Sequence, residues 1–262
     1  MKTIGFPAPL LGEQSLRLNV LAAQAGALVL EKPQGMLGDA HPWYPDTPDL
    51  ARAFQKQVDE AKPELETFGF KRVRSVFFQD AEATGAVVLS GTAEANETLR
   101  NEYGSNVCTF TYQFLARSSR SDREAFVCAL PLAQHFDKPQ MFISHKTGKK
   151  ACTHFSFLGD YGFYELWEAK ASFMRPHQIR YHAADQGLVI VGEHLYGEEL
   201  PLYFSQFKRK YTGRDRERPL YDGLYLHMTE LCMPFWGKEP VCIPLPKKFE
   251  VMLKKVEGAT KR

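Results

Sequence analysis

The stretch RPHQIRYHAADQGLVIVGEHLYG, residues 175–197, decides the fold of this chain. Its first half, residues 175–186, has the composition of one short helix, and Gly187 is a typical residue to end it. The run LVIVG that follows is apolar and β-branched, and it predicts a short strand at residues 188–192. A helix that leads directly into a strand is the kind of element order expected in an α+β domain.

On both sides of this stretch the sequence is rich in predicted strands. Residues 224–231, LYLHMTEL, predict a strand, and a Pro-rich strand is expected near the C-terminus. Upstream, short aromatic and β-branched runs are separated by polar turns at 107–115, 124–130, 140–144, 151–157 and 163–169.

The N-terminal part alternates strands with helices. Residues 15–30 predict one strand followed by a Pro/Gly turn, and three prolines make residues 38–48 an ordered loop. Thr47 and Pro48 predict the N-cap and first residue of a helix that stops near Pro63. The remaining predictions are strands at 73–79 and 86–89 and a helix at 92–103.

Composition and charge narrow the class of protein. The 262 residues are 44% hydrophobic and 24% charged, which excludes a disordered or fibrous chain. The longest apolar runs fall short of a bilayer span, and the N-terminus does not resemble a secretion signal. Five widely spaced cysteines without a CxxC motif predict reduced thiols in a cytoplasmic protein and no zinc site. With no repeat and no low-complexity linker, we expect one domain over residues 1–262.

Two local patterns suggest chemistry. His154 with Ser156, and His227 with Thr229, each place an imidazole and a hydroxyl on one face of a strand, as a two-histidine phosphoesterase requires. Asp160 with Glu168 and Lys170 resembles the carboxylates and lysine of a metal-dependent nuclease. The alternatives are chance tripeptides for the first pattern and a solvated strand end for the second.

A third pattern covers most of the chain. Residues 175–197 resemble the R-x-HQIR-x-H…GD-xx-YG block of the RluA-type pseudouridine synthases, and further blocks follow the order of that family over about residues 26–250. The matching segments are LVLEKPQGML (28–37), FFQDAEATGAVVLSGTAEANETL (77–99), FTYQFLAR (110–117), GKKACTHFSFLGDYGFYELWEA (148–169) and LYLHMTEL (224–231). The resemblance implies an α+β fold with a central, mostly antiparallel mixed sheet that a catalytic cleft splits, flanked by helices and loops.

The resemblance also implies an activity. These enzymes isomerise a uridine in RNA to pseudouridine and need no metal or redox cofactor. The catalytic carboxylate matches Asp80, and the arginine that pairs with it matches Arg180. A buried carboxylate stays ionised only beside a permanent cation, and arginine can hold it with two hydrogen bonds. Tyr112 matches the tyrosine that packs on the target base, where an aromatic face returns roughly 1–3 kcal/mol of lost stacking.

Five further residues are expected to bind the substrate. Leu226 provides an apolar wall, Gly85 allows the turn after Asp80 to approach the RNA closely, and Phe78 wedges into the space that the base vacates. Arg175 and His177, at the start of the HQIR block, complete the set.

This sequence departs from the family pattern at three places. The residues before Asp80 are Phe77, Phe78 and Gln79 where the family has His-Arg-Leu. Phe110 replaces a lysine, and Glu193 replaces the aspartate of the GD pair. Because Asp80, Tyr112 and Arg180 are present, we expect an active synthase. The alternative is a catalytically weakened relative that binds or remodels RNA.

We expect the protein to be a monomer. Its expected partner is structured RNA, either ribosomal or transfer RNA. Residues 207–218 form a basic insertion in which Lys208, Arg209, Lys210 and Arg214 are expected to hold the RNA backbone. An ordinary solvated loop, balanced by Asp215 and Glu217, is the alternative. About 25 residues precede the first family block, too few for the small S4 RNA-binding domain of many relatives.

Overall fold

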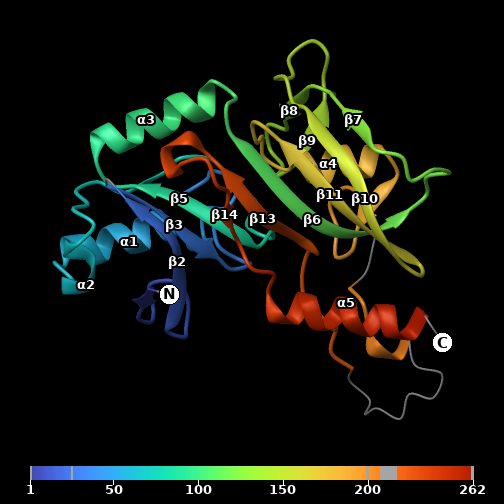
Figure 1. Cartoon of the computed structure of the whole chain (residues 1–262), viewed down its shortest axis with the longest axis horizontal. Helices are drawn as coiled ribbons and strands as arrows, with labels where there is room; N and C mark the ends of the chain where they lie inside the picture. The colour runs from blue at the N-terminus through green and yellow to red at the C-terminus, as the bar shows by residue number, and fades with distance from the viewer. Residues whose placement is uncertain (1, 25, 199–200, 207–216, 261–262) are drawn as a thin grey trace.

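A computed structural model describes residues 2–24, 26–198, 201–206 and 217–260. Two antiparallel sheets lie side by side in it, with helices against their outer faces (Figure 1). The strands are β1 (Thr3–Phe6), β2 (Leu16–Gln24), β3 (Ala27–Lys32), β4 (Arg74–Ser75), β5 (Gly85–Ser90), β6 (Thr109–Ser118), β7 (Phe126–Cys128), β8 (Leu132–Gln134), β9 (Met141–Ile143), β10 (Thr153–Tyr161), β11 (Tyr164–Ala171), β12 (Leu188–Ile190), β13 (Leu226–Cys232) and β14 (Val241–Cys242). The α-helices are α1 (Leu50–Asp59), α2 (Pro63–Glu66), α3 (Ala93–Gly104), α4 (Gln178–Asp185) and α5 (Lys247–Thr260), with short 3₁₀ turns at Phe204–Gln206 and Pro234–Trp236.

The five-stranded sheet, in the order β1-β2-β3-β5-β4, is buried on both faces. Side chains alternate between the faces of a strand, so β3 contributes Val29 to one hydrophobic core and Leu28 to another. In the same way β5 contributes Val88 to the first core and Val87 to the second. Helix α1 covers the second face, and this explains why β3 and β5 are apolar at nearly every position.

The larger sheet has the order β14-β13-β6-β11-β10-β7, and β12 also pairs with β6. Its central strand β6 buries Phe110, Tyr112 and Phe114. Helix α5 packs against it through Phe249 and Met252, which are fully buried. A small separate sheet is formed by β8 and β9.

The two large sheets meet along a seam between β5 and β13. Thr84, just before β5, donates its backbone N–H to the carbonyl of Leu226 at 3.1 Å and accepts from the N–H of Met228 at 3.0 Å. Its hydroxyl lies 2.8 Å from Nδ1 of His227. The turn of residues 76–84, which carries Asp80, is therefore fixed to the strand that carries Leu226.

The predicted α+β class with antiparallel sheets is confirmed, as are the ordered loop at 38–48 and the helix at α3. Residues 15–30 are not one strand but the hairpin of β2 and β3, because Gly26 adopts a positive φ of 77°. The strand predicted at 73–79 shrinks to β4.

The remaining differences concern helix ends. The N-cap of α1 is Asp49 and not Thr47, since its carboxylate accepts the Arg52 N–H at 2.7 Å. The helix expected to stop near Pro63 ends at Asp59, and Pro63 is the first residue of the next helix, α2. The C-terminal part holds α5 after the two-residue strand β14, so the Pro-rich strand expected there is largely wrong.

Candidate active site at the seam of the two sheets

Asp80 lies almost completely buried at the seam, with 8% of its surface exposed. Its Oδ1 accepts the backbone N–H of His177 at 2.9 Å. His177 precedes α4 in a left-handed conformation, with φ 52°, and this aims the N–H at the carboxylate. Burial raises the pKa of Asp80, while the charge of Arg180, the His177 N–H and the charge of Lys32 act in the opposite direction.

Arg180 is fully buried and holds Glu193 rather than Asp80. Its Nε and Nη2 donate to the two Glu193 oxygens at 2.6 and 2.8 Å, and Nη1 lies 3.2 Å from Glu82. The predicted direct pair with Asp80 is therefore corrected. Glu193 stands where the family pattern has an aspartate, its contact with Arg180 is bidentate, and Arg180 acts on Asp80 through its field.

Lys32 is a buried cation of the site that the sequence analysis did not single out. Its Nζ donates to the backbone carbonyls of Ala81 and Ala83, at 3.2 and 2.6 Å, on either side of Glu82 in the turn. Burial lowers the pKa of Lys32 to about 7, opposed by the charges of Asp80 and Glu82. In the sequence, Lys32 belongs to the segment LVLEKPQGML (28–37), which resembles the family. That resemblance was the signal that could have identified it as a site residue.

A small closed cavity of about 10 Å³ adjoins Asp80. Five of the predicted site residues line it, and they come from four separate parts of the chain: Phe78, Asp80, Tyr112, Arg175 and Leu226. The hydroxyl of Tyr112 is buried there and has no hydrogen-bond partner among the residues that the structure describes, and burial together with the charge of Asp80 raises its pKa well above the usual value. The hydroxyl of Tyr112, which is available to bond a ligand, therefore lies in the same cavity as the carboxylate of Asp80.

His177 does not face this cavity, in contrast to the prediction. Its ring is fully buried, with Nδ1 2.7 Å from the hydroxyl of Tyr196 and Nε2 3.0 Å from that of Tyr44. Burial, then the charge of Arg180, lowers its pKa to about 3, so the imidazole is neutral. The residue contacts Asp80 through its backbone, and its side chain fastens the surrounding loops.

Gly85 lies where the two sheets pack together at the seam. Its φ is 148°, and a Cβ placed on it would lie 2.6 Å from Cβ of Met228 on β13 and 2.8 Å from the side chain of Gln79. A glycine is required here because the two strands come so close at the seam.

Phe78 is half-buried at the outer side of the cavity. Its ring lies 4.8 Å from that of His41, in the loop of residues 38–48, and His41 also contacts Trp43. Trp43 in turn packs on His177 at 5.3 Å between ring centroids. These loop aromatics were missed, although the pair Trp43-Tyr44 within an ordered, proline-rich loop was a signal for them.

Arg175 lines the cavity and stacks over the ring of Phe173 at 4.3 Å. The four predicted backbone-binding residues Lys208, Arg209, Lys210 and Arg214 lie outside the residues that the structure describes.

The phosphoesterase pattern is not assembled. His154 is exposed on β10, whereas His227 is buried on β13, and two strands lie between β10 and β13 in the sheet. Three strand spacings amount to about 14 Å. His227 bonds Thr84 and the carbonyl of Ile243 instead.

The nuclease pattern is not assembled either. Asp160 pairs with Arg123 at 2.6 Å, while Glu168 pairs with Lys170 at 2.8 Å. Within the described ranges, no group of three or more His, Cys, Asp or Glu side chains is placed to hold a metal ion. Over the same ranges no helix has the length and hydropathy of a membrane span, and all five cysteines are free.

Comparison with known proteins gives a consistent result. An uncharacterized RNA pseudouridine synthase of Synechocystis is 25% identical over 92% of this chain and 69% of its own length. A second, from Chlorobaculum parvum, is 25% identical over 95% of this chain and 77% of its own. The ribosomal large subunit pseudouridine synthase D of Haemophilus influenzae is 27% identical over 45% of this chain and 36% of that protein. No protein-family model matches.

Solved structures agree in fold. Human RNA pseudouridylate synthase domain containing 4 superposes with a TM-score of 0.68 at 16% identity, covering 91% of this chain and 92% of that one. Human RNA pseudouridylate synthase domain containing 1 gives 0.60 at 20% identity, covering 87% and 84%. The resemblance seen in the sequence is thus confirmed, and the chain is a homologue of the RNA pseudouridine synthases that has their fold.

Proposed function

We propose that this protein isomerises a specific uridine in structured RNA, ribosomal or transfer RNA, to pseudouridine, with Asp80 as the catalytic carboxylate. One observation carries the proposal: Asp80, Tyr112 and Leu226, far apart in the sequence, line one cavity at the seam of a chain whose homologues are named RNA pseudouridine synthases.

The carboxylate of Asp80 serves as a nucleophile toward the ribose C1′, or as a base, as the C1′–N1 bond breaks; a bond that it forms to C1′ breaks again when C5 takes its place. The uracil turns, C5 bonds to C1′, and the C5 proton leaves while N1 gains one, so the atoms balance without a co-reactant. The His177 N–H and the positive charges of Arg180 and Lys32 favour the ionised carboxylate that this chemistry needs.

Tyr112 provides the face against which the flipped uracil packs. Its hydroxyl has no hydrogen-bond partner within the described part of the chain, so a polar atom of the base can satisfy it. The apolar side chain of Leu226 forms the adjoining wall.

A base cannot enter the site without side-chain movement. A cavity of about 10 Å³ is at most the size that one water occupies. Phe78 and Arg175, which line its outer side and are only half-buried, are the groups that have to swing away. The closed cavity also favours a second candidate, a relative that binds or remodels RNA without catalysis.

Pseudouridine mapping of total RNA separates the two candidates. It compares cells with the gene intact, deleted, or carrying Asp80→Asn. The matched control is Asp160→Asn, which removes an exposed carboxylate of β10 that forms an ion pair with Arg123. We expect one or a few uridines to lose the modification in the deletion and in Asp80→Asn and to keep it in Asp160→Asn.

An RNA pool with no changed uridine in the deletion would favour the RNA-binding candidate. A site that is lost in the deletion but kept in Asp80→Asn would keep the activity and remove Asp80 from the mechanism.

A further inference from the structure

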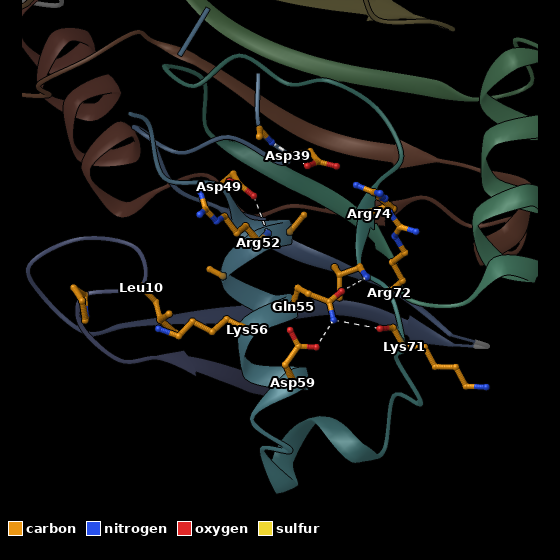
Figure 2. Close-up of a pocket in the computed structure, with 15 residues that line it drawn as sticks. Leu10, Asp39, Asp49, Arg52, Gln55, Lys56, Asp59, Lys71, Arg72 and Arg74 are labelled. Carbon is orange, nitrogen blue, oxygen red and sulfur yellow. Dashed lines mark hydrogen bonds between the residues drawn. The ribbon is translucent and has the colours of Figure 1, made fainter. Parts of the chain in front are cut away.

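A large open hollow lies beside α1, on the five-stranded half of the molecule. It has a volume of about 900 Å³ and is bounded by α1, residues 39–40 of the loop and residues 71–74 (Figure 2). Five cationic side chains line it: Arg52, Lys56, Lys71, Arg72 and Arg74. We call this feature the basic hollow.

The five cations of the basic hollow are exposed and unpaired. No carboxylate within the described residues comes within ion-pair distance of any of them, although the rest of the chain contains several such pairs. Unpaired cations gathered on one surface create a positive potential that attracts a polyanion.

Three aspartates also line the basic hollow, and the carboxylate of each accepts hydrogen bonds from other groups of the protein. Asp49 caps α1, and Asp59 accepts from the Gln55 amide at 2.8 Å. Asp39 accepts from the N–H groups of Ala40 and Ser75, at 2.9 and 3.4 Å. These hydrogen bonds engage the three carboxylates (Figure 2), while the side chains of the five cations are exposed.

The backbone that presents the cations is held firmly. Gln55 of α1 donates to the carbonyl of Lys71 at 3.2 Å and accepts the N–H of Val73 at 2.7 Å. The N–H groups of Lys71 and Arg72 both donate to the carbonyl of Gly91. A second hollow of about 500 Å³, near the start of α3, shares Lys71, Arg72 and Arg74, so residues 71–74 form a fixed basic ridge with open space on both sides.

The ridge leads to the candidate active site. Arg74 precedes Asp80 by six residues, a chain length of at most about 20 Å. On the other wall, residues 39–40 are followed by His41, whose ring packs on Phe78 beside the cavity. The basic hollow therefore lies within the reach of a few nucleotides of an RNA bound at Asp80.

We propose that the basic hollow binds the sugar–phosphate backbone of the substrate RNA next to the modified uridine. The proposal rests on the proposed function, in that RNA is the ligand of the Asp80 site. Several separated cations over an open surface fit a string of phosphates better than one small anion, and such contacts set position and affinity without reading sequence. Its residues are different from those of the insertion at 207–218.

The test is the salt dependence of RNA binding, because each phosphate contact adds about 0.7–0.9 to the slope of log affinity against log salt. The probe is a fluorescein-labelled RNA stem–loop with uridines in its loop, titrated by anisotropy between low and physiological salt. All proteins carry Asp80→Asn, so that binding is measured without turnover. The test variant is K71Q/R72Q/R74Q. The matched control is K247Q/K248Q/K254Q, which removes the same charge from exposed positions of α5.

We expect the test variant to bind at least about tenfold more weakly at low salt, with a slope reduced by about two, while the α5 variant changes affinity less than about twofold. R52Q/K56Q, on the opposite wall of the hollow, should give an intermediate loss. Circular dichroism melting shows that each variant is folded.

Equal losses in the test and α5 variants would overturn the proposal, since only the net charge would then matter. So would unchanged binding in K71Q/R72Q/R74Q, or no binding of the stem–loop by the parent protein. These outcomes are independent of the cellular mapping: the basic hollow can hold RNA in a protein that makes no pseudouridine, and an active enzyme can bind through another surface.

Discussion

The seam around Asp80 and the basic hollow beside α1 use charge in opposite ways. At the seam, Arg180 is fully buried and its guanidinium is held by Glu193, which is 1% exposed. In the basic hollow, Arg72 and Arg74 are exposed and have no carboxylate partner within the described ranges. The two regions are only a few residues apart in sequence, because the ridge runs directly into the turn that carries Asp80.

The difference shows how one chain can keep the charges of a reactive site apart from the charges that attract a ligand. Buried charges must be compensated, because removing an ion from water costs several kcal/mol. Compensation fixes their positions, which suits a site where geometry decides the rate. Exposed charges cost little and stay available for a partner, which suits a surface that holds RNA by its phosphates. Four predictions on stability test this contrast.

The largest effect is expected from Arg180→Met. The change leaves Glu193 buried without its partner, and breaking a buried pair in this way costs about 3–5 kcal/mol. Urea unfolding measures the loss in the free energy of unfolding. Arg123→Met is the exposed counterpart, since Arg123 pairs with Asp160 and Glu165 and is 47% exposed, and it should cost much less than Arg180→Met.

The double variant Arg180→Met/Glu193→Leu should recover part of the lost stability, because it removes the unpaired Glu193, while Asp80 and Glu82 still lack the positive charge of Arg180. Equal losses for Arg180→Met and Arg123→Met would mean that the burial of the Arg180 pair is not what sets its contribution.

The second prediction concerns the pH dependence that Lys32 contributes. Its pKa falls from 10.5 to about 7 on folding, chiefly through burial. Between these values the unfolded chain holds a proton that the folded chain lacks, so this group makes stability rise with pH, by at most about 1.4 kcal/mol per unit. Below about pH 7 both states are protonated and the slope vanishes.

Comparison of the protein with Lys32→Met isolates this contribution. The difference in the free energy of unfolding should grow in favour of the unmodified protein from pH 7 to 10. Lys56→Met, at an exposed lysine of the basic hollow, is the matched control for the loss of a lysine side chain. A difference for Lys32→Met that does not change with pH would show that its ammonium is not held in a dry environment.

These charge arrangements also mark where sequence reasoning succeeds and where it stops. The blocks that carry Asp80, Tyr112 and Leu226 could be recognised in order, and the fold brings these three residues to one cavity. The partner of Arg180 could not be predicted, because three carboxylates compete for it and only the structure shows that Glu193 holds it. A left-handed residue such as His177 is equally invisible until the backbone is known.

Two of the unusual residues explain each other once the structure is known. Phe77 and Phe110 stand where the family has histidine and lysine, and their rings pack together at 4.7 Å between centroids. Both are buried, so an apolar contact replaces two polar side chains at once. Of the Phe-Phe pair only Phe78 lines the cavity, a distinction that depends on the backbone of the turn at residues 76–84 and not on composition.

The third prediction reverses the sign of the effect. Within the described part of the chain the hydroxyl of Tyr112 is buried without a hydrogen-bond partner, and such a group costs about 1–3 kcal/mol. Tyr112→Phe should therefore raise the free energy of unfolding by about that amount while it lowers pseudouridine formation. Tyr103→Phe is the control: Tyr103 Oη donates to the carbonyl of Met174 at 2.7 Å, so its loss should destabilise the protein. Destabilisation by both variants would indicate that Tyr112 has a partner in solution, such as a bound water.

The smallest effect is expected from the ridge itself. K71Q/R72Q/R74Q removes three exposed and unpaired cations, and surface changes of this kind alter the free energy of unfolding by less than about 0.5 kcal/mol each. Because the variant also relieves repulsion between like charges, its free energy of unfolding should rise slightly. Long aliphatic stems can also cover apolar surface, so a loss of several kcal/mol would mean that these side chains support the fold of residues 71–74. The hydrogen bonds of Gln55 and Gly91 hold that segment through its backbone, which is why its side chains are free to serve a ligand.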